Sequence, residues 1–211
     1  MTQLLPSALP ALDKHTLLLR WARRQIGQID HELRVERLAL TLFALTRPLH
    51  RLGMAERNLL ALAALVHDVG RSLEDADHEM HGAAMLQVAG DLPLTETERR
   101  RLMFLTRYHR GKVADAGCED HLRPADDRVS LRILLALLRA ADALDSRHLA
   151  SPQIALSLCG RTLAITCYLR DVSPKALRKL GKKKKFLLLE ETLKLRVAVD
   201  LLNVQEVELV A

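Results

Sequence analysis

The stretch LLALAALVHDVG, residues 59–70, constrains the fold of this chain more than any other stretch. Its nearly unbroken run of Leu, Ala and Val predicts a helix that is buried in a core. The run ends on His67 and Asp68, two side chains of the kinds that bind divalent metals. Burying both would cost several kcal/mol unless a cation or a network of hydrogen bonds satisfied them. Gly70 follows, where we expect a left-handed residue to close the helix.

The composition favours helices over sheets. Apolar residues make up 49% of the 211 residues but aromatic residues only 3%, so the core must consist mainly of Leu, Ala and Val. Leu and Ala are strong helix formers, whereas a sheet-based core would need more β-branched and aromatic residues. No apolar run reaches the roughly 18 residues of a membrane span. The first residues, MTQLLPSALPALDKH, do not resemble a signal peptide and the three cysteines form no CxxC pair, so we expect a cytoplasmic protein without disulfides.

Apolar residues recur at helical spacing through the first part of the chain. Asp30 is a suitable N-cap for the second helix, and Thr95 with Glu98 forms a capping box for the fifth. The segment RPLHRLG is expected to turn the chain into the apolar helix, and residues 110–126 to form a loop. The helices are expected over 11–27, 31–46, 59–70, 78–88, 96–109 and 128–145.

Beyond Pro152 the apolar pattern changes to a period of two, which is typical of half-buried strands. Gly160 and Arg161 supply a two-residue turn, so Cys159 should lie opposite Thr162. Ser173 and Pro174 suit the start of a basic helix that runs to about residue 190, and VQEVELV is a candidate fourth strand. We therefore predict a mostly α protein, with a helical domain over 1–150 and a small α+β lobe over 151–211. The first three strands are expected over 154–158, 163–169 and 193–201.

The net charge of +6 suggests an anionic partner, and much of the basic excess lies after residue 174. This basic segment is either a phosphate-binding face or the solvated flank of a helix. Its cationic residues are Lys175, Arg178, Lys179, Lys182, Lys183, Lys184, Lys185, Lys194 and Arg196.

Polar residues of metal-binding types occur at the ends of three predicted helices, in the order His, His-Asp and Asp along the chain. His31, the pair His67–Asp68, and Asp142 each lie at an end of a predicted helix. This order resembles the HD superfamily of metal-dependent phosphohydrolases. The segments LALTLFALTRPLHRLG, LAALVHDVG, HEMHGAAML, TRYHRG and LLRAADALDSRH together resemble the C-terminal HD domain of the exopolyphosphatase and guanosine pentaphosphate phosphohydrolase family, over about residues 25–200.

The resemblance implies an HD-domain helical bundle and an HD site, but not the family's named activity. In that family the phosphatase chemistry belongs to an N-terminal actin-like ATPase domain, and this sequence contains no Gly-rich phosphate loop of that kind. One or two divalent ions are implied. Imidazole and carboxylate ligands without thiolates suit Mn, Fe, Mg, Co or Ni rather than structural zinc. The implied metal ligands are His31, His67, Asp68, His81, His109 and Asp142.

Within this set, the resemblance implies that His67, Asp68 and Asp142 form the catalytic centre. Asp68 would bridge two metals, while His81 and His109 would bind the second. For these two histidines, a simple polar lining is an equally good alternative. His78 would support a ligand rather than bind a metal.

Basic residues near the implied ligands are candidates for binding substrate phosphate. Arg107, Arg110 and Lys112 flank His109, and Arg147 follows Asp142. Solvated surface charges are the alternative for these side chains. A further acid, Asp145, could orient a ligand or the attacking water.

Three functions are consistent with the sequence. The first is a phosphohydrolase that cleaves a phosphate ester or anhydride in a nucleotide-like or polyphosphate-related substrate. The second is a non-catalytic regulatory HD module that binds a polyanion or nucleotide, and the third is an interaction subunit, for example a homodimer. With three Phe, two Tyr and one Trp, the chain offers few aromatic side chains on which bases could stack, so nucleic acid is not favoured as a partner. No membrane partner is expected.

Overall fold

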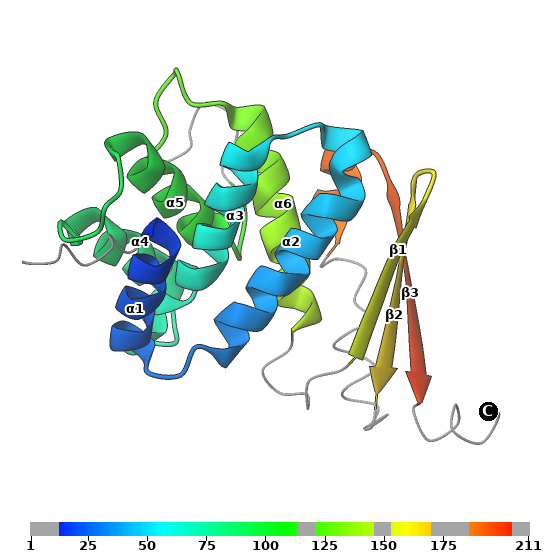
Figure 1. The fold of residues 1–211 in the computed structure, drawn as a ribbon, viewed down its shortest axis with the longest axis horizontal. Coiled ribbons are helices and arrows are strands. Elements are labelled where there is room, and N and C mark those ends of the chain that lie inside the picture. Colours follow the sequence, from blue (N-terminus) through cyan, green and yellow to red (C-terminus); the bar gives the residue numbers. More distant parts are fainter. Residues whose placement is uncertain (1–12, 114–120, 146–152, 170–185, 204–211) are drawn as a thin grey trace, which may run out of the picture.

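The computed structural model describes residues 13–113, 121–145, 153–169 and 186–203. Helices fill most of the molecule, and a three-stranded sheet stands at one side of them (Figure 1). The predicted fold class, mostly α with a small α+β part, is confirmed. Among the described helices, none combines the length and the apolarity needed to cross a bilayer. The elements are α1 (Lys14–Ile26), α2 (Asp30–His50), α3 (Met54–Val66), the 3-10 turn η1 (Val69–Ser72), α4 (His78–Val88), α5 (Glu96–Tyr108), α6 (Arg128–Leu144), β1 (Gln153–Cys159), β2 (Thr162–Leu169), α8 (Leu187–Leu193) and β3 (Arg196–Asn203).

Helix α3 is the buried axis of the helical part. Every residue from Leu59 to Val66 is buried, as expected for a helix that is apolar on all sides. Helices α1, α2, α5 and α6 all contact it. The predicted buried helix is therefore present, and it carries His67 and Asp68 into the interior.

Helix α2 is longer than predicted at both ends. Asp30, predicted as its N-cap, is instead its first residue, and Ile29 occupies the N-cap position without a side-chain cap hydrogen bond. The helix does not end before Arg47 but continues to His50, with Pro48 inside its last turn. The His50 side chain supports this extension, because its Nε2 lies 3.0 Å from the carbonyl oxygen of Phe43 and its Nδ1 accepts a hydrogen bond from the backbone of Leu52 at 2.9 Å. The helix then ends at Arg51, whose φ of 57° is left-handed.

Gly70 does not close α3 in a left-handed conformation, so that prediction was wrong. It lies inside η1, and it is absent from the described glycines with positive φ. Its lack of a side chain serves a close packing contact instead. A Cβ placed there would lie 2.0 Å from the carbonyl oxygen of His78 and 2.5 Å from the backbone nitrogen of Gly82. Gly70 therefore allows α4 to approach η1 closely, which brings His78 near Asp68.

We expect Gly70→Ala to destabilise the protein by about 1–3 kcal/mol, because the added methyl group forces two backbone segments apart. Urea unfolding followed by circular dichroism measures the change. Gly90→Ala is the matched control, since a Cβ at Gly90 meets nothing within 4 Å. Its free energy of unfolding should change by less than about 1 kcal/mol. Equal stability of the two variants would contradict the close approach.

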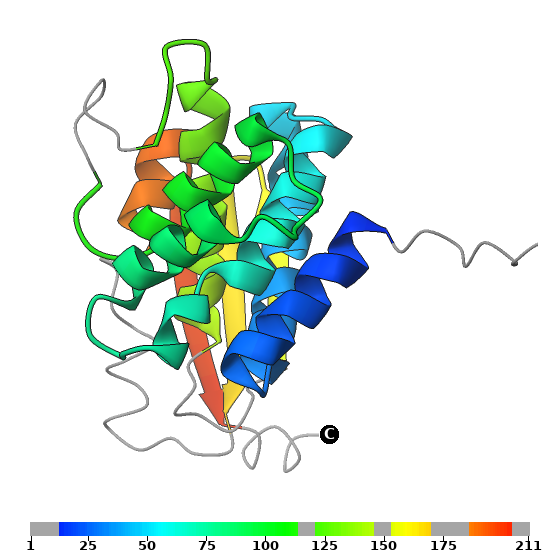
Figure 2. The ribbon, with the colours of Figure 1, turned by 90° about the vertical axis from the view of Figure 1, so that its left-hand side faces the viewer.

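The sheet packs on the bundle through one face. Strands β1 and β2 are antiparallel, with Cys159 opposite Thr162 as predicted, whereas β2 and β3 are parallel. Figures 1 and 2 show the helices on one side of the sheet. Leu163 and Ile165 of β2 are buried in the same apolar cluster as the helices, together with Phe186. The boundary near residue 150 stays a prediction.

The end of the chain differs in detail from the prediction. The third strand was expected from residue 193, but α8 continues to Leu193 and β3 begins only at Arg196. The first part of the predicted basic helix and the candidate strand VQEVELV lie outside the described residues, as does Cys118. Cys159 and Cys167 are free thiols, and burial raises the pKa of the Cys167 thiol to about 11.

Candidate metal centre

Four histidines and two aspartates from five helical segments meet at one place, and each comes from a helix end. His31 lies in the first turn of α2, and His78 is the first residue of α4. His67 and His109 directly follow α3 and α5. We call this group the His/Asp cluster; it consists of His31, His67, Asp68, His78, His109 and Asp142.

The two aspartates connect the imidazoles of the cluster. Oδ1 of Asp68 lies 2.9 Å from Nε2 of His78 and 3.3 Å from Nε2 of His109. Oδ1 of Asp142 lies 3.3 Å from Nε2 of His31 and 3.7 Å from Nε2 of His67. The same ring nitrogen of every histidine therefore faces a carboxylate.

The other ring nitrogen of each histidine is anchored outside the cluster. In His67, His78 and His109, Nδ1 donates to the carbonyl oxygen three residues earlier, at 2.8, 2.8 and 2.7 Å respectively. In His31, Nδ1 donates to Oδ2 of Asp145 at 2.7 Å. This arrangement places a proton on Nδ1 of each ring, so a neutral ring presents the lone pair of Nε2 to a metal ion, as in metal-binding histidines, and a charged ring presents an N–H to the carboxylate.

The Nε2 atoms show that this arrangement fits a cation. Nε2 of His67 is buried and has no hydrogen-bond partner among the described residues, and such a buried polar atom costs about 1–3 kcal/mol. Nε2 of His78 lies 3.3 Å from Nε2 of His109, so two lone pairs face each other unless a proton or a cation lies between them. The nitrogen and oxygen donors match the ions that the sequence predicts.

The electrostatics favour positive charge at His67, whereas burial lowers the pKa of His109 and favours its neutral form. Burial alone would lower the pKa of His67, but the carboxylates of Asp68 and Asp142 outweigh it and raise the pKa to about 9. Burial alone would raise the pKa of Asp68, but the charge of His67 and hydrogen bonds from the neighbouring imidazoles hold it well below its usual range. The pKa of Asp142 is lowered in the same way, by His31 and His67. Both carboxylates are therefore ionised and able to balance a cation.

The donors divide into two groups whose ligand atoms lie within 4.8 Å of one another in each group: His31 with His67 and Asp142, and Asp68 with His78 and His109. The second oxygen of Asp68 also lies 3.8 Å from Nε2 of His31, so Asp68 faces both groups. Asp142 has a side chain that is 34% exposed, and the other five are buried. The centre could therefore hold one or two ions, and it is open to solvent beside Asp142.

His81 is not part of this centre. Its side chain is 39% exposed, and its Nε2 lies 3.8 Å from a carboxylate oxygen of Glu74. The structure places His78 where the family resemblance implied His81. The reason is that α4 packs on η1 through its first turn and Gly82, which turns His78 toward Asp68.

The predicted phosphate-binding residues differ in how close they lie to the centre. Arg110 lies beside the centre, with Nη1 at 3.2 Å from Nδ1 of His78, and its side chain is 52% exposed. Arg107 contacts Glu79, at 3.9 Å, and the ring of Tyr108. Lys112 is exposed, and Arg147 lies outside the described residues.

Charged side chains behind the centre hold the ligands in place. Asp145 is buried and accepts from both His31 and Nε of Arg34, the latter at 2.8 Å, which fits its predicted orienting role. Nε of Arg71 donates to the second oxygen of Asp68 at 2.8 Å. Sequence reasoning did not identify Arg34, Arg71 or the fully buried Glu32. The only available signal was their closeness in sequence to the predicted ligands.

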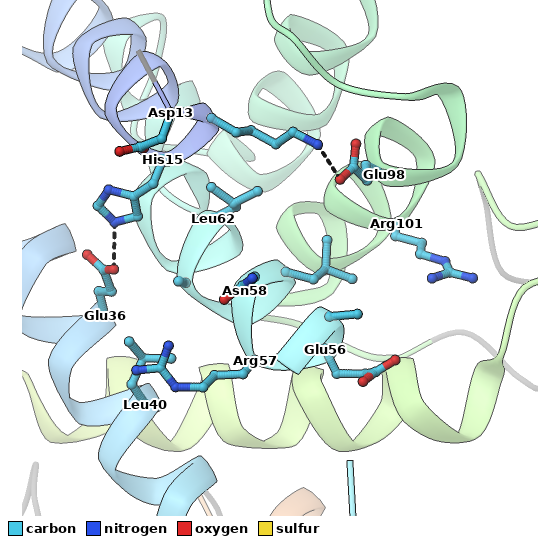
Figure 3. A pocket seen from close by; sticks show the side chains of 14 residues that line it. Asp13, His15, Glu36, Leu40, Glu56, Arg57, Asn58, Leu62, Glu98 and Arg101 are labelled. Carbon is cyan, nitrogen blue, oxygen red and sulfur yellow. Dashed lines mark hydrogen bonds and ion pairs between the residues drawn. The ribbon is translucent and has the colours of Figure 1, made fainter. Parts of the chain in front are cut away.

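A separate cavity of about 650 Å³ lies among α1, α2, α3 and α5 (Figure 3). None of the cluster residues lines it. Ion pairs between His15 and Glu36, at 2.7 Å, and between Lys14 and Glu98 stand beside it. This cavity is therefore distinct from the candidate metal centre.

Comparison with known families now identifies the fold. Residues 23–164 match the family model described as Ppx/GppA phosphatase, domain III. The chain belongs to this family. The domain III match contains the whole His/Asp cluster and ends within β2, so α8 and β3 lie beyond it. It confirms the resemblance found in the sequence. No curated protein matches the chain significantly.

Proposed function

We propose that this domain III protein is a metal-dependent phosphohydrolase. The observation that carries the proposal is the common orientation of four imidazoles, each anchored through Nδ1 and turned with Nε2 toward an ionised aspartate. The match to domain III does not itself bring the phosphatase activity, so hydrolysis of a phosphate ester or anhydride is proposed from the His and Asp donors of the cluster. The substrate that we propose is nucleotide-like or related to polyphosphate.

The buried side of the centre would bind the cations, and its open side would bind the substrate. His31, His67 and Asp142 would hold one cation, and Asp68, His78 and His109 a second. Divalent ions bound at such positions polarise phosphoryl oxygens and stabilise the attacking and leaving groups. On the open side, the exposed guanidinium of Arg110 would bind a phosphate oxygen through charge-assisted hydrogen bonds.

Metal analysis combined with a substrate screen tests this function. The purified protein should contain Mn, Fe, Mg, Co or Ni, and it should hydrolyse p-nitrophenyl phosphate, its diester or a nucleoside triphosphate in the presence of Mn²⁺ or Mg²⁺. Chelation should abolish turnover, and added metal should restore it. A metal-free protein that takes up no added cation would contradict the proposal, and so would hydrolysis that persists after chelation.

The net charge of +6 favours a second candidate, a regulatory module that binds a polyanion. The same screen separates the two functions. A metal-loaded protein that turns over no substrate but binds polyphosphate, with an affinity that falls steeply as salt is added, would support the binding module. Under either function we propose a cytoplasmic location, which agrees with the free thiols of Cys159 and Cys167.

A further inference from the structure

We propose that Glu32 is a carboxylate ligand of the metal centre, placed where its two groups of donors meet. The inference rests on the proposed metal-dependent function. Ligand atoms of Glu32, His31 and Asp68 lie within 4.8 Å of one another. His31 belongs to the first group and Asp68 to the second, so Glu32 is close to both.

Burial places Glu32 on the inner side of the centre. Its exposed fraction is 0%, whereas the Asp142 side chain is 34% exposed. A substrate that enters beside Asp142 would therefore not reach Glu32. A role in holding a cation fits this position better than a role in proton transfer to substrate.

The carboxylate of Glu32 adds to the negative charge of the centre. Its ligand atom lies within 4.8 Å of that of Asp68, and a cation between two carboxylates so close to each other would offset their repulsion. The buried Nε2 of His67, which has no hydrogen-bond partner among the described residues, belongs to the same centre. A positive ion would satisfy the carboxylates and the imidazole together.

The variant Glu32→Gln tests the inference, because it keeps the size of the side chain and removes its charge. Calorimetry on the full chain measures the affinity and the stoichiometry of Mn²⁺ binding. We expect the variant to bind Mn²⁺ with an affinity weakened by roughly 10- to 100-fold or more. Glu36→Gln is the matched control. Glu36 lies one turn further along α2, where its Oε1 contacts His15 at 2.7 Å, and this variant should bind Mn²⁺ as the wild type does.

The stability of the metal-free protein separates a ligand from a purely structural residue. Without metal, Glu32→Gln should melt at the same temperature as the wild type, because the amide keeps the size of the side chain and can still accept a hydrogen bond. Mn²⁺ should then raise its melting temperature less than it raises that of the wild type. A structural role predicts the reverse: a lower melting temperature without metal and an unchanged Mn²⁺ affinity.

The outcomes distinguish this inference from the proposed function. Wild-type protein that binds Mn²⁺ with Glu32→Gln binding it equally well would overturn the role of Glu32 alone. Wild-type protein that binds no cation would overturn both. If Glu32→Gln fails to fold, Glu32→Asp serves instead, since it keeps the charge but withdraws the carboxylate by one methylene group. Weakened Mn²⁺ binding by a folded Glu32→Asp variant would support the inference, and unchanged binding would overturn it.

Discussion

Replacement of Asp68 by Asn is expected to remove both the bound cation and the hydrolysis of phosphoesters. Oδ1 of Asp68 lies 2.9 Å from Nε2 of His78 and 3.3 Å from Nε2 of His109, and its other oxygen faces His31. No other side chain of the cluster faces both groups of donors so directly. An amide of the same size lacks the negative charge that balances a divalent ion. We expect kcat/KM for p-nitrophenyl phosphate to fall on the order of 100-fold or more, with metal content falling in parallel.

Asp75→Asn is the control for this variant, because both aspartates contact the same arginine, Arg71. The Asp75 side chain is 84% exposed, so its loss should leave metal content and turnover unchanged, and stability within about 0.5 kcal/mol. Circular dichroism should confirm that both variants fold. Asp68→Asn protein that keeps the full metal content of the wild type would disprove the bridging role of this carboxylate.

Local chemistry made the helical framework predictable. The Thr95–Glu98 capping box starts α5 as expected, since the Thr95 side chain accepts from the Glu98 backbone and the Glu98 carboxylate returns to Thr95. The apolar run that precedes His67 has no polar face, so it had to be buried, and its content of Leu and Ala favoured a helix. The alternation of apolar and polar residues with a period of two likewise predicted β1 and β2. In each case, residues that are close in sequence determine the outcome.

Tertiary contacts explain the errors. A glycine after a helix commonly adopts a left-handed conformation, but Gly70 is needed because the His78 carbonyl oxygen lies only 2.0 Å from the site of a Cβ. This steric reason for a glycine is visible only in the packing of α4 on η1. The length of α2 depends in the same way on a contact between the His50 side chain and a carbonyl seven residues earlier. Periodicity carries no information about either contact.

The ligand set could be predicted only in part for a related reason. The family resemblance indicated His31, His67, Asp68, His109 and Asp142, and the structure brings all five together. The resemblance did not indicate Glu32. The sequence offered no other reason to choose this residue, since a glutamate beside a histidine in the first turn of a helix is usually solvated. Nor did it indicate that Arg34 and Arg71 would hold buried carboxylates. Such roles depend on which face of a helix the neighbouring elements cover.

The motif HEMH offers two histidines, and their replacement is expected to have opposite results. His78→Ala removes an imidazole nitrogen that lies 2.9 Å from Asp68 and 3.3 Å from that of His109. We expect cation affinity to fall by roughly 10- to 100-fold, with loss of the second ion where two are bound, and hydrolysis to fall with it. His81→Ala removes a side chain that is 39% exposed. It should leave metal content and turnover unchanged.

This pair is informative because both variants shorten the same residue type on the same helix, one turn apart. Any general effect of losing an imidazole from α4, on helix propensity or on solubility, should therefore appear in both. Metal analysis and turnover under Mn²⁺ should differ only in His78→Ala. If His81→Ala instead loses the cation and His78→Ala keeps it, α4 must be rotated about its axis in the metal-bound protein. The close packing of Gly82 on Gly70 opposes such a rotation, because it fixes the face that α4 turns toward Asp68.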